Sequence, residues 1–190
     1  MTLTTEDINT QLSAGERVLW SGQPRQGVII RGADAFMIPF SLLWGSFAIF
    51  WEFSVINSNA PVFFALFGIP FVLVGIYLII GRFFFEAKHR ARTYYAVTNE
   101  RILIISDLSC RKVQSLDLRT LSDLSLSEGK GNEGTITFGS GSPFNSMFGG
   151  FSSWPGTGAY LGPRFELVAN AKTIFETIRR AQRAAASART

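Results

Sequence analysis

Two apolar stretches decide the fold, AFMIPFSLLWGSFAIFW at residues 35–51 and APVFFALFGIPFVLVGIYLIIG at residues 60–81. The second holds no ionisable group except the phenol of Tyr77. As a helix it is about 33 Å long, enough to cross a hydrocarbon core about 30 Å thick. The first stretch meets its first charge at Glu52 and continues through FSVI. Because backbone groups in lipid must be hydrogen-bonded internally, both stretches are predicted to be membrane-spanning helices.

Other interpretations of these stretches are disfavoured. Buried helices of soluble proteins rarely run beyond about 14 wholly apolar residues. A cleavable signal peptide would start earlier, end in a small-x-small site and lack the second span. Glu52 lies near the polar turn at residues 57–59, which favours a place at the membrane interface over an ion path. Gly45, Gly68 and Gly75 would let the two helices approach closely.

Basic residues flank the predicted hairpin on one side only, and the connecting loop has none. They are Arg17, Arg25, Arg31, Arg82, Lys88, Arg90 and Arg92. By the positive-inside rule, both termini face the cytoplasm and the turn faces outward. Arg82, Lys88, Arg90 and Arg92 are also candidate lipid-head-group residues, although topology and surface anchoring are the simpler role.

The chemistry of the chain changes after Arg92. Short β-branched and aromatic runs alternate with turns, which predicts six or seven strands in meander order. A helix follows from Asn170, and its apolar stripe of Ile174, Ile178, Ala181 and Ala185 could close an open barrel or sheet end. The predicted fold class is therefore a two-helix transmembrane hairpin joined to a mainly β, α+β domain with a C-terminal helix.

Three motifs carry a resemblance to a known family. They are Leu12, Gly15-Glu16-Arg17-Val18-Leu19-Trp20, Gly22, Pro24, Arg31 and Asp34; then Tyr95 to Leu103; then Phe165-Glu166-Leu167 with the helix after Asn170. In these motifs the chain resembles the bacterial pleckstrin-homology-like membrane proteins, over most of its length apart from residues 139–162.

The resemblance implies a fold and a setting in the bacterial inner membrane, but no settled activity. The predicted organisation is a cytoplasmic N-terminal segment at 1–34, the hairpin at 35–82 and a cytoplasmic pleckstrin-homology-like domain at 93–188. Phosphoinositide binding, frequent in eukaryotic relatives of the fold, is not carried over. The first hairpin turn here reads Asn99-Glu100-Arg101, with one acid and one base.

Residues suited to catalysis or metal binding are scarce. The chain of 190 residues has one His and one Cys, which excludes multi-Cys metal sites and disulfide frameworks. His89 is predicted to lie at the surface, and Cys110 to be buried as a small apolar residue. Gly129-Lys130-Gly131 lacks the spacing and context of a phosphate-binding loop. No enzyme, metal, cofactor or small-molecule substrate is predicted.

The formal charge of +4 does not indicate nucleic-acid binding, because the basic residues sit beside the spans and on the terminal helix. Residues 139–162, GSGSPFNSMFGGFSSWPGTGAYLG, are a predicted insertion that we call the aromatic segment. It has no charge and carries seven large apolar side chains: Phe144, Met147, Phe148, Phe151, Trp154, Tyr160 and Leu161. It could enter the lipid interface or dock on a partner membrane protein. A flexible insertion without such a role is the alternative.

These patterns predict a non-enzymatic inner-membrane scaffold or accessory subunit. It would bind another integral membrane protein or complex through the β domain and the aromatic segment. The alternative is a membrane-surface sensor that binds anionic lipids through its basic collar. Head-group binding should weaken steeply with ionic strength, and apolar docking much less.

Overall fold

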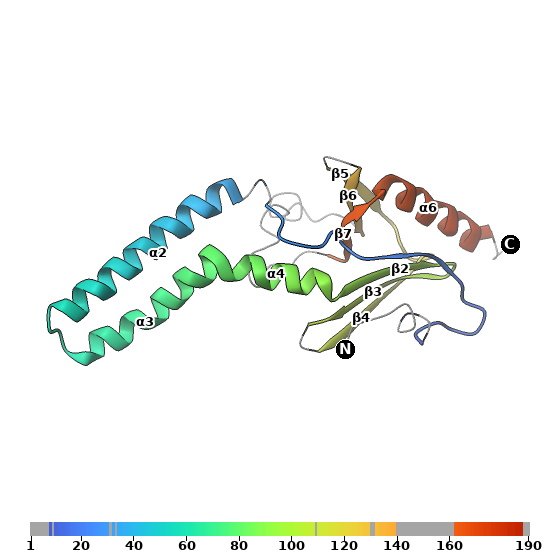
Figure 1. The fold of residues 1–190 in the computed structure, drawn as a ribbon. Helices are drawn as coiled ribbons and strands as arrows, with labels where there is room; N and C mark the ends of the chain where they lie inside the picture. Colours follow the sequence, from blue (N-terminus) through green and yellow to red (C-terminus); the bar gives the residue numbers. More distant parts are fainter. Residues whose placement is uncertain are drawn as a thin grey trace.

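The computed structural model describes residues 8, 10–30, 32, 34–108, 110–129, 132–139 and 162–187. The elements follow in the order β1 (Val18–Gly22), α2 (Asp34–Asn57), α3 (Val62–Ile76), the π-helix η1 (Tyr77–Gly81), α4 (Arg82–Ala91), β2 (Thr93–Thr98), β3 (Arg101–Asp107), β4 (Arg111–Asp117), β5 (Leu124–Glu128), β6 (Glu133–Phe138), β7 (Arg164–Ala169) and α6 (Ala171–Ser187). Figure 1 shows a helical hairpin that projects from one end of a β domain.

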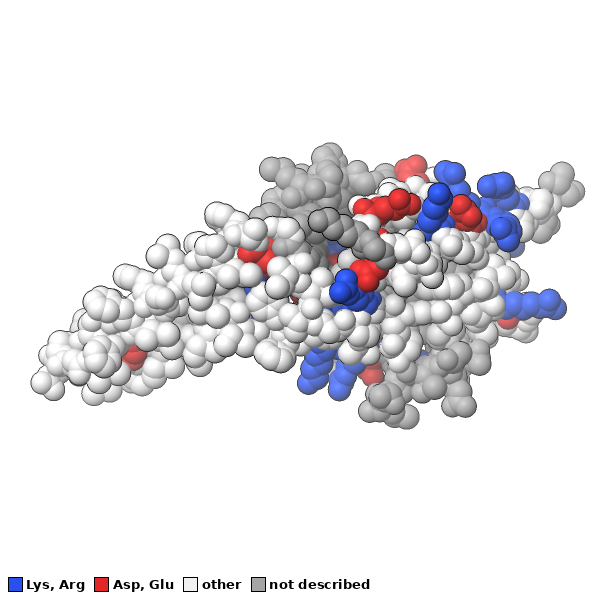
Figure 2. Space-filling model, turned by 45° about the horizontal axis from the view of Figure 1, so that its top comes forward, with Lys and Arg blue, Asp and Glu red and all other residues white. Residues whose placement is uncertain are grey.

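The hairpin consists of two helices that are long and apolar enough to cross a membrane, as predicted. One is α2, and the other is the continuous helix Val62–Ala91, formed by α3, η1 and α4. In the most apolar 18-residue stretch of each helix, only 22% and 11%, respectively, is buried inside the protein. Their surface is almost free of charge on the face shown in Figure 2, whereas charged side chains gather over the β domain. These are therefore not the core helices of a globular domain.

Small residues let the two helices of the hairpin pack closely. Ser41, Gly45 and Ala48 are the buried positions in the middle of α2. A Cβ atom built on Gly75 would lie 3.1 Å from the Cα atom of Gly45, closer than side chains normally pack. The predicted close approach is confirmed at this pair of glycines.

The β domain holds two antiparallel sheets. One has the order β1-β2-β3-β4 and the other the order β5-β6-β7. The six strands that follow the hairpin within the described residues match the predicted meander. The seventh, β1, precedes the hairpin in sequence yet pairs with β2, with Val18 opposite Thr98 and Gly22 opposite Tyr95. The hairpin is thus an insertion between two neighbouring strands, and β1 within segment 1–34 belongs to the β domain.

Helix α6 closes the β domain with its predicted apolar stripe. Ile174, Ile178 and Ala181 are buried in the same cluster as residues of both sheets. At the centre, the Phe165 ring lies 4.5 Å from the Tyr95 ring and 4.9 Å from the Phe138 ring, centroid to centroid. The core therefore joins both sheets and α6 into one body at the base of the hairpin.

Candidate functional site

The junction between the hairpin and the β domain holds a buried ion pair. The Nη2 atom of Arg82, at the start of α4, lies 2.8 Å from Oδ1 of Asp34, at the start of α2. Their side chains are 6% and 2% exposed. The Arg82 guanidinium also lies 4.4 Å from the centre of the Phe83 ring. The π-helical turn η1 ends directly before Arg82 and changes the face from which the following residues project. Both helices are thus tied together where they meet the β domain.

Arg90 fastens the other end of α4 to the chain that follows β1. Its Nη1 donates to the Glu86 carboxylate, and its Nη2 donates to the backbone oxygen of Gly27 at 2.7 Å. Gln26 donates in turn to the backbone oxygen of Arg90 at 3.4 Å. Gly27 has a positive φ of 89°, a conformation that glycine adopts without strain. The segment between β1 and α2 is therefore held against α4.

The four basic residues predicted to meet lipid head groups fall into two classes. Arg82 and Arg90 are buried and pair with acids of the protein itself. Lys88 and Arg92 are exposed. Nη1 of Arg92 donates to the backbone oxygen of Leu108 at 3.2 Å, which places this side chain beside the turn between β3 and β4. Only two of the four cations are therefore free to face an external partner.

A second ion pair, buried on its Glu16 side, joins the first two sequence motifs. Glu16 precedes β1, and its two carboxylate oxygens accept from Nε and Nη2 of Arg101 at 2.9 and 2.8 Å. They also accept from the Thr98 hydroxyl at 2.7 Å and the Ser13 backbone N–H at 2.8 Å. Arg101 completes the contact by donating to the backbone oxygen of Gln11 at 2.7 Å. The N-terminal motif is thus clasped to the β2–β3 turn.

Glu16 and Arg101, which form this clasp, stay ionised at any physiological pH. Burial of the Glu16 carboxyl opposes its ionisation, but the hydrogen bonds from Arg101, the Ser13 backbone and Thr98 outweigh burial and lower its pKa from 4.5 to about 2. The hydrogen bond to Glu16 raises the pKa of the Arg101 guanidinium. A carboxylate with such a low pKa offers no proton near neutral pH, so the pair holds structure rather than exchanging protons.

The remaining candidate residues have the following places. His89 is exposed, as predicted, and its Nε2 lies 3.4 Å from the Ser106 hydroxyl. The prediction of a buried Cys110 is wrong, because this thiol is exposed beside the β3–β4 turn. The carboxyl of Glu52 lies against Gly68 on α3, and its buried Oε2 makes no hydrogen bond. The seven apolar residues of the aromatic segment, from Phe144 to Leu161, lie outside the described residues.

The arrangement can couple the hairpin to the β domain. Among the described residues, no group of three His, Cys, Asp or Glu side chains could hold a metal ion. The sequence motifs contained Glu16, Asp34 and Arg101, but their spacing alone did not indicate that they form ion pairs. Comparisons of the chain with protein-family models, with curated proteins and with solved structures find no match.

Proposed function

We propose that the protein is a non-enzymatic scaffold or accessory subunit of a membrane protein complex. One observation carries the proposal: the hairpin is inserted between two paired strands, β1 and β2, and its base is fastened by Asp34–Arg82 and by Arg90–Gly27. Such an attachment fixes the orientation of the β domain relative to the spans. A fixed orientation suits a domain that must offer one surface to a partner in the same membrane.

The proposal places the hairpin across the bacterial inner membrane with both termini in the cytoplasm. Its apolar side chains support this placement, since Phe36, Leu43 and Phe63 are 67%, 73% and 70% exposed and would lose contact with water in lipid. The basic residues lie at the β-domain end of the spans, in agreement with the positive-inside rule.

The β domain is proposed to be pleckstrin-homology-like. Support comes from the four-stranded and three-stranded antiparallel sheets and from the single C-terminal helix that packs into the core between them. Since a fold alone does not assign an activity, the role rests on the site, where Glu16 and Arg101 are engaged in structural contacts.

Purification in mild detergent from native membranes tests the scaffold role. The full chain should retain specific integral membrane proteins. A variant in which the seven large apolar side chains of the aromatic segment are replaced by serine should lose them, because the length of the segment is kept but its apolar surface is not. A matched variant with serine-to-threonine changes in the same segment should keep its partners. If the full chain and both variants retain the same partners, docking through this segment is contradicted. If the full chain retains no specific partner, the scaffold role is contradicted.

A further inference from the structure

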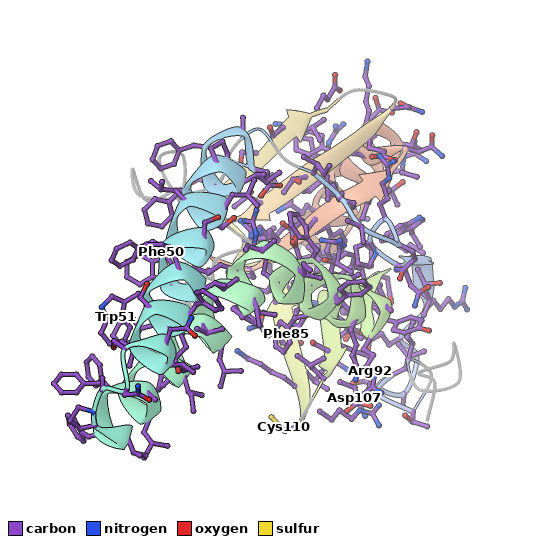
Figure 3. All side chains as sticks on the ribbon, turned by 60° about the vertical axis from the view of Figure 1, so that its left-hand side comes forward. Phe50, Trp51, Phe85, Arg92, Asp107 and Cys110 are labelled. Carbon is purple, nitrogen blue, oxygen red and sulfur yellow. The ribbon has the colours of Figure 1, made fainter. Side chains whose placement is uncertain are left out.

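The β3–β4 hairpin brings a further basic residue to the end of α4. Ser106 on β3 lies 3.4 Å from His89 on α4, and Lys112 on β4 is paired directly opposite Ser106. Residues opposite one another in an antiparallel pair share a sheet face, so Lys112 projects on the side where α4 ends. Arg92 reaches the same turn through the Leu108 backbone. Figure 3 shows Arg92, Asp107 and Cys110 together at the end of this hairpin.

Cations dominate the surface formed in this way. Lys88, Arg92 and Lys112 are exposed. Asp107 and Arg111 are paired opposite one another one residue away from the Ser106–Lys112 pair, so they project on the other face of the sheet, and the nearby Glu86 is already bound by Arg90. We call the three exposed cations Lys88, Arg92 and Lys112 the collar surface. One of them, Lys112, comes from the β3–β4 hairpin and not from the helix that continues the span.

We propose that the collar surface rests on the anionic phospholipid head groups of the leaflet from which the hairpin emerges. This role goes beyond that of a scaffold, because it assigns a lipid partner and adds the β3–β4 turn to the membrane-contacting part of the protein. The recognised feature is the phosphate-rich, negatively charged bilayer surface, not a soluble anion.

The height of the collar surface above the spans supports this assignment. With the Asp34–Arg82 pair at the inner edge of the hydrocarbon core, Lys88 lies at most about 9 Å farther along the helix and Arg92 about 15 Å. The head-group layer of one leaflet is about 5–8 Å thick, and charges interact through water over a further distance of about 8 Å at physiological salt. Phe84 and Phe85, 66% and 53% exposed, lie at the intervening level, where aromatic rings are favoured.

The collar surface differs in position from the other basic group of the protein. Arg180 and Arg183 are exposed near the C-terminal end of α6, which points away from the hairpin in Figure 1. A general attraction between a basic protein and an acidic membrane would use both groups. Docking through the collar surface uses only the residues beside the span, so the α6 arginines provide a matched control.

The single cysteine makes the proposal measurable in the full chain. Cys110 is exposed next to Arg111, so a fluorophore attached to it reports on the β3–β4 turn. The purified chain would be placed in nanodiscs of phosphatidylcholine alone, or with one third phosphatidylglycerol, both containing a lipid with a quencher on its head group. We expect stronger quenching in the anionic nanodiscs, and a loss of this excess at about 1 M salt, where the screening length falls to about 3 Å.

Charge substitutions identify the residues responsible. Each cation near an anionic leaflet should shift the ratio of docked to undocked turn about fivefold, or about 1 kcal/mol. Lys88→Gln with Lys112→Gln should therefore reduce that ratio at least tenfold, whereas Arg180→Gln with Arg183→Gln should leave it unchanged. Both pairs are exposed, and circular dichroism would confirm that each variant is folded.

Two results would overturn the proposal. One is equal quenching in neutral and anionic nanodiscs, which would mean that the turn is held by the hairpin alone. The other is an equal loss of quenching in the collar and α6 variants, which would mean that the attraction is not local. The purified chain contains no protein partner, so these results are independent of whether the scaffold role is correct.

Discussion

Glu16→Gln would measure how much the clasp between the N-terminal motif and the β2–β3 turn stabilises the β domain. The substitution keeps the size of the side chain and removes the charge that accepts hydrogen bonds from Arg101, Thr98 and Ser13. The Glu16 side chain is fully buried and that of Arg101 is 27% exposed, so solvent screens the pair only from the Arg101 side. A carboxyl pKa that falls from 4.5 to about 2 on folding corresponds to about 3 kcal/mol of stability at neutral pH. We expect the variant to lose this amount.

The pH dependence of the loss follows from the sign of the shift. The pKa of Glu16 is lower in the folded chain than in the unfolded chain, so its contribution is complete above about pH 4.5 and is lost as the pH falls toward 2. The difference in unfolding free energy between the natural chain and Glu16→Gln should therefore be constant from pH 8 to about pH 5. It should shrink steadily below that range, because glutamine does not titrate.

Urea unfolding followed by a short pulse of protease would report on the β domain in micelles. Tryptophan fluorescence would not separate the two parts, because Trp44 and Trp51 lie on α2 and Trp20 lies on β1. Glu100→Gln is the matched control, since it removes the same charge from an exposed neighbour of Arg101 and should cost less than about 0.5 kcal/mol. A loss below about 1 kcal/mol in Glu16→Gln, or a difference that persists unchanged to pH 2, would refute the reasoning.

Two further predictions concern the hairpin. Asp34→Asn leaves the buried guanidinium of Arg82 without its counter-charge, so we expect a loss of about 3–5 kcal/mol in the free energy of unfolding. The loss would be seen as a lower Tm of the chain in micelles. An unchanged Tm would mean that water or lipid replaces the carboxylate. Gly75→Leu places a side chain where even a Cβ would lie 3.1 Å from Gly45, so spin labels on the two helices should move apart, whereas Val74→Leu at an exposed position should leave their distance unchanged.

Local patterns predicted the elements whose stability depends on their own sequence. The two long helices of the hairpin are recognisable because an apolar run of their length would have to be helical in lipid. The strands and α6 are recognisable because alternation and helical spacing place apolar residues on one face. Ile174 and Ile178 were predicted to face the core for this reason, and they do.

Contacts between distant residues were not predictable in the same way. The strand β1 has only five residues, and its partner β2 follows the entire hairpin, so no local pattern indicates their pairing. The burial of Arg82 depends likewise on Asp34, which belongs to the other helix. Cys110 was expected to be buried because free cysteines usually are, but its position at a hairpin turn leaves it exposed.

The positive-inside rule counts every cation beside a span equally, whereas burial gives these cations different roles. Arg82 and Arg90 are neutralised within the protein, and their guanidinium groups fix the angle at which the β domain leaves the hairpin. Lys88 and Arg92 keep their charge at the surface. Because the buried pair fixes the orientation, the exposed pair is held at a constant height beside the β3–β4 turn. The proposed contact of the collar surface with lipid head groups therefore depends on the buried arginines as much as on the exposed cations. Asp34→Asn removes a negative charge, which by itself would favour an anionic membrane, yet we expect it to weaken docking of the Cys110 label.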